Sequence, residues 1–113
     1  MFLLDTNVVS EWMKPWPNQR VIAWLDAQPA KQLYLPAVAK AEIESGIALL
    51  PDGKRKAALQ RASQVVIDEF SSRCLPLDCE TTIAYAKILS QSKIAGRPMS
   101  VEDVQIAAIA YQN

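Results

Sequence analysis

The stretch Met1-Phe2-Leu3-Leu4-Asp5-Thr6-Asn7 decides the fold, because a short apolar run is followed directly by three polar residues. A continuous apolar run is typical of a strand in a parallel sheet, which is buried on both faces. The polar residues then lie at the carboxyl end of that strand, where open α/β sheets bind their ligands. We therefore expect Asp5 at the ligand-binding edge of a sheet.

The rest of the chain alternates short apolar strands with longer helices. Two more strands are expected at Leu33–Leu35 and Cys74–Leu77. Helices are expected at Val8–Lys14, Asn18–Ala27, Ala37–Leu50, Lys54–Phe70, Cys79–Ile94 and from Ser100 past Tyr111. This order predicts one α/β domain over residues 1–113, in which helices flank a short parallel sheet in three layers. Three strands are few for so many helices, so we expect the sheet to be incomplete at its carboxyl-terminal end.

Composition excludes several classes of function. Twelve basic and twelve acidic residues give a net charge of zero, so attraction to nucleic acid has to come from local patches. The chain has no His, which excludes Ser-His-Asp and Cys-His catalysis. The chain has only two cysteines, Cys74 and Cys79, and structural zinc sites use four Cys or His ligands, so the sequence argues against a zinc site. Any reaction must depend on carboxylates, hydroxyls, Lys and Arg.

No apolar run approaches the roughly 20 residues that a membrane-spanning helix needs. Asp5 also interrupts the apolar start of the chain, so that start does not have the pattern of a signal peptide. The expected location is the cytoplasm.

Three acidic residues occupy positions where a carboxylate is unusual. Asp5 follows a strand, Glu42 is expected on an apolar stripe of the Ala37–Leu50 helix, and Asp103 begins an almost wholly apolar helix. Asp103 should face inward with Ala107 and Ala110.

Each acid also has a structural explanation. Asp5 can cap the following helix, although Thr6 or Asn7 could do so instead. An ion pair would satisfy Glu42. Asp103 stands three residues after Ser100, as in a capping box, and Glu102 competes for that role.

Taken together, the three acids predict a shared metal pocket. Carboxylates that are packed together repel one another and require a counter-charge. With no His, a hard cation such as Mg²⁺ or Mn²⁺ satisfies this requirement, because these ions prefer oxygen ligands. Asp5, Glu42 and Asp103 are therefore the expected metal-binding and catalytic residues.

Three segments resemble one protein family. The Phe2–Ser10 stretch, the Ala41-Glu42-Ile43 segment and the Ser100–Ala108 segment are similar to those of PIN-domain ribonucleases. Within them, the chain looks most like the VapC-type toxins of bacterial toxin–antitoxin operons, in the FitB-like branch. The Ile47–Gly53 and Ala95–Pro98 segments also look like that branch, so the likeness follows the whole chain in order.

The resemblance implies a metal-dependent endoribonuclease that forms a homodimer and is neutralised by a small DNA-binding antitoxin. It assigns the family's acids to Asp5, Glu42 and Asp103, and it assigns to Thr6 the hydroxyl that assists the metal site. It also implies a continuation after the last helix, with two more strands and a fourth acid.

Basic residues are candidates for contacting the RNA backbone. They are Lys54, Arg55, Lys56 and Arg61 on one expected helix, and Arg97 in a loop near the expected site. A solvated helix face explains the first four equally well.

Two other functions remain open. The same fold may serve as an inactive module that binds a protein partner through the Asn18–Ala27 and Ala37–Leu50 helices. A haloacid-dehalogenase-like phosphatase also places an Asp after its first strand, but it needs a second Asp at the position of Asn7.

Overall fold

The computed structural model describes residues 1–113 as an α/β domain around a three-stranded parallel sheet. The strands are β1 (Phe2–Leu3), β2 (Leu33–Pro36) and β3 (Cys74–Leu75), and β2 lies between the other two. Phe2 pairs with Leu33, and Leu35 pairs with Cys74. The expected fold class is confirmed, and β1 and β3 are each two residues shorter than expected.

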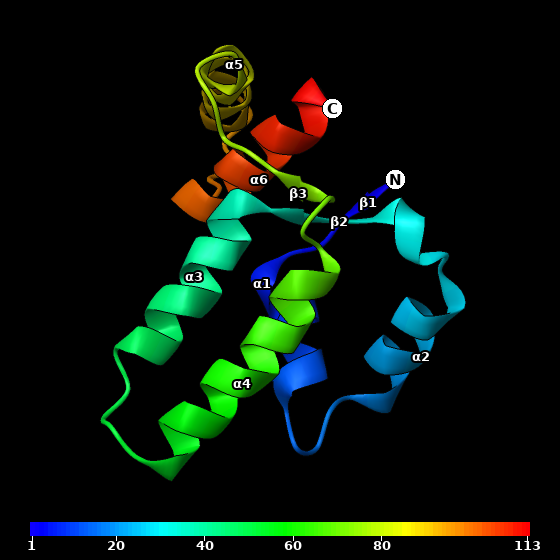
Figure 1. Cartoon of the computed structure of the whole chain (residues 1–113). Helices are drawn as coiled ribbons and strands as arrows, with labels where there is room; N and C mark the ends of the chain where they lie inside the picture. The colour runs from blue at the N-terminus through cyan, green and yellow to red at the C-terminus, as the bar shows by residue number, and fades with distance from the viewer.

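Helices cover both faces of this sheet, so that it forms the middle of three layers. They are α1 (Thr6–Ser10), α2 (Gln19–Ala27), α3 (Ala37–Ala48), α4 (Lys54–Glu69), α5 (Thr81–Ile94) and α6 (Val101–Gln112). Short 3-10 turns, η1 (Glu11–Met13) and η2 (Ala30–Gln32), follow α1 and precede β2. Figure 1 shows α5 and α6 on one side of the strands and α3 and α4 on the other. None of the helices has the length and apolar character that a membrane crossing requires.

Side-chain caps explain where two of the helices begin. The Asn18 side chain accepts hydrogen bonds from the backbone N–H groups of Arg20 and Val21, and it starts α2. Ser100 accepts from the backbone N–H of Asp103 at 3.1 Å and starts α6. Both positions were expected from the sequence, because Asn and Ser satisfy the unpaired N–H groups of a first helical turn.

The core lies between the sheet and the helices α1 to α4. It contains Leu4, Val9, Leu25, Leu33, Leu35, Ala39, Ile43, Ile47 and Phe70. The central strand supplies its middle, and Leu35 is wholly inaccessible to solvent. The helices α5 and α6 bury Ala84, Val104, Ala108 and Ile109 on the other side.

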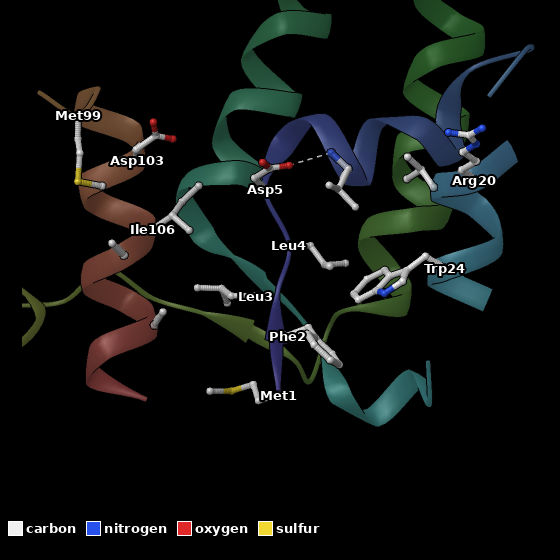
Figure 2. Close-up of a pocket in the computed structure, with 14 residues that line it drawn as sticks. Met1, Phe2, Leu3, Leu4, Asp5, Arg20, Trp24, Met99, Asp103 and Ile106 are labelled. Carbon is white, nitrogen blue, oxygen red and sulfur yellow. Dashed lines mark hydrogen bonds between the residues drawn. The ribbon is translucent and has the colours of Figure 1, made fainter. Parts of the chain in front are cut away.

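One outer edge of the sheet is open, contrary to the expectation that the first strand is buried. The N–H of Leu4 donates to the carbonyl of Tyr34, so the backbone groups of Leu3 point to the opposite side, where no strand pairs with them. Phe2 is exposed and Leu3 is half-buried for the same reason. An apolar groove of about 870 Å³ runs along this edge, with α6 as one wall and α2 as the other (Figure 2).

Candidate active site

Asp5 lies at the carboxyl end of β1 and caps α1. Its Oδ1 accepts a hydrogen bond from the N–H of Val8 at 2.9 Å, and its backbone is extended at φ −80° and ψ 169°. The expectation that Thr6 or Asn7 leaves Asp5 free of this role is wrong, because the helix already begins at Thr6. Only Oδ1 is engaged, and the side chain remains exposed.

Thr6 connects two distant parts of the chain through its hydroxyl group. Its Oγ1 lies 3.1 Å from Oε2 of Glu42 and 2.9 Å from Oε1 of Glu102. A hydroxyl carries one proton, so it can donate to only one of these carboxylates at a time. The first turn of α1 thereby brings α3 and α6 together at the carboxyl edge of the sheet.

Glu42 is exposed, which corrects the expectation that it lies on a buried stripe. The buried face of α3 carries Ala39, Ile43 and Ile47, whereas Leu49, expected on the stripe of Glu42, is 84% exposed. Apolar residues of α3 are spread over several sides of the helix instead of one stripe, so the sequence pattern did not identify the buried face. What places Glu42 at the site is the contact with Thr6, not burial.

Glu102 is the site residue that sequence reasoning missed. It is half-buried, and it contacts Thr6 where Asp103 does not. Hydrogen bonding to the Glu42 carboxyl and partial burial raise the pKa of Glu102, and the negative charges of Glu42 and Asp103 act in the same direction. A signal was present, since Glu102 shares a helical face with Ile106 and Ile109, and Ile109 is fully buried.

Asp103 faces the apolar groove together with Ala107 and Ala110, as expected. Figure 2 shows it on α6, across the groove from Asp5 on the β1 side. It is exposed, and its side chain forms no ion pair. The three predicted acids and Glu102 thus fall into two sets, Asp5 with Asp103 at the groove and Glu42 with Glu102 at Thr6, and no three of them are placed to hold a metal ion.

None of the basic candidates forms an ion pair with these acids. Lys54 and Arg55 are exposed in the first turn of α4, and Lys56 forms an ion pair with Asp52 at 3.2 Å. Arg97 is exposed after α5 and makes no side-chain hydrogen bond to the acids. Arg55 lines a hollow together with Lys14 and Pro15.

The donor atoms at this edge suit a hard divalent cation. Four carboxylates and one hydroxyl supply oxygen atoms only, which is the ligand type that Mg²⁺ and Mn²⁺ prefer. The negative charges of Glu42 and Asp103 contribute to the raised pKa of Glu102, as expected for carboxylates that lie close to one another.

Comparison with known proteins identifies the family of this fold. Residues 2–113 match the PIN domain. The chain belongs to the PIN-domain family. This PIN domain is 44% identical to the toxin FitB of Neisseria gonorrhoeae over 114 aligned positions, which cover 100% of the chain and 82% of FitB. It is 40% identical to a VapC ribonuclease of Sinorhizobium fredii, over 97% of the chain and 79% of that protein.

A solved structure of FitAB bound to a DNA fragment has the same fold as this PIN domain. The TM-score is 0.92 at 44% sequence identity, and the match covers 99% of the chain and 79% of the FitAB chain. The resemblance stated from the sequence is therefore confirmed.

Proposed function

We propose that this PIN domain is a Mg²⁺- or Mn²⁺-dependent endoribonuclease and the toxin of a toxin–antitoxin pair. The observation that carries the proposal is the set of acids that β1, α3 and α6 bring to the carboxyl edge of the sheet, joined by the Thr6 hydroxyl. The identity to a VapC ribonuclease and to the toxin FitB supports RNA as the substrate.

Each acid has a separate role in this proposal. Asp5 and Asp103 would hold the cation from the two sides of the groove, and Thr6 would keep Glu42 in place beside them. When bound, the cation supplies positive charge to the scissile phosphate and lowers the pKa of water. Glu42 would orient the attacking water, which forms a bond to phosphorus while the P–O3′ bond breaks. The 3′-oxygen leaves as a hydroxyl, so the products carry a 5′-phosphate and a 3′-hydroxyl.

The proposed partners are an antitoxin and a second copy of the chain. The solved FitAB structure, which is bound to a DNA fragment, supports a cognate DNA-binding antitoxin. The homodimer is what the family resemblance implies. Lys54, Arg55 and Arg97 are exposed, as residues that contact an RNA backbone must be.

Replacing Asp5 by Asn tests the catalytic assignment. Asn caps helices as well as Asp does, so D5N should keep the hydrogen bond to Val8 and the melting temperature. Because the amide is neutral, D5N should lose Mn²⁺-stimulated cleavage of a labelled RNA, measured on a denaturing gel. Asp26→Asn, an exposed acid on α2, is the matched control and should cut like the unaltered chain. Full activity of D5N would disprove the assignment.

A second function is favoured by the groove along β1. Eleven of the 14 residues that line it are hydrophobic, so the groove presents apolar surface suited to a protein partner. In this case the chain would act as a catalytically inactive module that binds an antitoxin or itself. The two functions differ in whether a divalent cation binds.

A further inference from the structure

The loop between η1 and α2 is held rigidly at both ends by one carboxylate. Glu11 is buried, its Oε1 accepts a hydrogen bond from the N–H of Asn18 at 2.7 Å, and its other oxygen forms an ion pair with Lys14. The contact with Lys14 and the bond from Asn18 hold the pKa of Glu11 below its usual range, so the anchor stays charged. Pro15 and Pro17 restrict the backbone between these two ends.

Trp16 stands at the centre of this rigid loop and is directed to solvent. It is 91% exposed, more than any other large hydrophobic residue of the chain. The contacts of Glu11 and the two prolines restrict the backbone on both sides of Trp16, and this backbone places the indole ring in solvent. Single exposed hydrophobic residues are common on protein surfaces, so the residues around Trp16 decide whether it belongs to a binding site.

The surroundings of Trp16 favour a nucleic acid over a protein. Arg20 and Arg55 are exposed, neither has a carboxylate partner, and Arg55 lines a hollow with Lys14 and Pro15. Lys14 and Asn18 lie two residues from Trp16 along the chain, and basic residues beside an exposed ring suit the phosphates of a nucleic acid.

Two hollows flank the same loop, and one of them reaches Asp5. A second hollow extends from Asp5 and Asn7 to Lys14 and Asn18, and Lys14 lines both hollows. A strand that lies along them would pass Arg55, then the Trp16 loop, and then Asp5. Bases of single-stranded RNA stack on exposed aromatic rings while basic residues contact the phosphates.

We propose that Trp16 is a positioning residue that stacks on an unpaired base of single-stranded RNA and directs the strand toward Asp5, with Arg55 at a phosphate. This inference rests on RNA being the substrate of the proposed function. It assigns to Trp16 the role of holding the RNA strand beside the acids, and RNA binding tests this role without any cleavage.

The experiment measures binding of a short fluorescein-labelled oligouridine in EDTA by fluorescence anisotropy. Trp16→Ala should raise the Kd about five-fold or more, the range of a lost base–aromatic stack, and Trp16→Phe should restore most of the affinity. Leu49→Ala is the matched control, because Leu49 is 84% exposed at the end of α3 and should not alter the Kd. Equal affinity of Trp16→Ala and the unaltered chain, or no binding by the unaltered chain, would overturn the inference.

Cleavage assays separate this inference from the proposed function. With Mn²⁺, Trp16→Ala should raise KM and leave kcat nearly unchanged, because the ring touches the strand and not the reacting phosphate. If Trp16 contributes to RNA binding but the chain cleaves no RNA, the proposed ribonuclease activity is wrong and the role of Trp16 stands. If the chain cleaves RNA and Trp16→Ala leaves KM unchanged, the role of Trp16 is wrong and the ribonuclease activity stands.

Discussion

A single hydroxyl organises the acidic edge of this protein. Thr6 stands one residue after Asp5 and lies within hydrogen-bonding distance of both Glu42 and Glu102, which are 36 and 96 residues away in the chain. Because it can donate only one proton, one of the two carboxylates is always less well satisfied. The hydrogen bond between the Glu42 and Glu102 carboxyls and the partial burial of Glu102 raise the pKa of Glu102, and the Thr6 hydroxyl lowers it by a smaller amount.

The raised pKa of Glu102 makes stability depend on pH. The carboxyl of the unfolded chain ionises near 4.5 and that of the folded chain ionises above it, so the folded state binds more protons in the window above 4.5. The free energy of unfolding therefore falls as pH rises through that window. Glu102→Gln should have a higher melting temperature than the unaltered chain at about pH 7. The two should differ little at about pH 4, where the Glu102 carboxyl is mostly protonated in both the folded and the unfolded chain.

Circular dichroism melts at the two pH values measure this difference. Glu69→Gln is the control, since Glu69 is exposed and makes no ion pair, and it should melt like the unaltered chain at both values. A lower melting temperature of Glu102→Gln at neutral pH would show that Glu102 stabilises the fold as an anion, contrary to this account.

At the scale of elements, α2 depends on the residue that precedes it. The Asn18 side chain accepts from two N–H groups of the first turn, at 2.9 and 3.3 Å, and its own N–H donates to Glu11. The cap thus ties the start of α2 to the anchor of the Trp16 loop. Leu25 is the one residue of α2 that is fully buried, so the cap is one of few contacts that fix the start of this helix.

Removal of the cap should weaken the fold by a predictable amount. Asn18→Ala leaves two N–H groups of α2 without a side-chain acceptor, and we expect a loss of about 1 kcal/mol in the free energy of unfolding. Urea denaturation followed by circular dichroism measures it. Asn18→Asp keeps an acceptor oxygen and should retain most of the stability, while an unchanged midpoint for Asn18→Ala would contradict the role of the cap.

The whole molecule exposes more surface than its size predicts. Its accessible area is 7489 Å², against about 6,200 Å² for an average folded monomer of this mass. Its radius of gyration is 15.3 Å, against about 13 Å for a compact domain of this length. Only 18 of 113 residues are buried. A ligand that binds only the folded state stabilises it by mass action.

Titration with Mn²⁺ should therefore raise the melting temperature if the acids bind a cation. At a hundred-fold excess over the Kd, binding to the folded state alone adds about 2.7 kcal/mol to the free energy of unfolding. Thermal melts at increasing Mn²⁺ measure the shift, which Asp5→Asn should lose and Asp26→Asn should retain. No shift at any concentration would favour the inactive, partner-binding module.

Local sequence features were sufficient to predict the order of the helices and strands and the family of this chain. The short apolar runs, the Asn18 and Ser100 caps and the Pro36 that ends β2 are decided by neighbouring residues, so their places were predicted within a few positions. Asp5 at the carboxyl end of a parallel strand followed from the same rules, because strand and helix order alone define that edge.

Only the tertiary structure decided which acids meet. Glu102 and Asp103 are adjacent, and a rotation of α6 by one residue exchanges their directions, which depends on how Val104, Ala108 and Ile109 pack. The buried face of α3 was likewise set by its contact with the sheet, since apolar residues surround most of that helix. Tertiary packing thus placed Thr6 between Glu42 and Glu102, left the outer edge of β1 open, and directed Trp16 to solvent, none of which is encoded in local spacing.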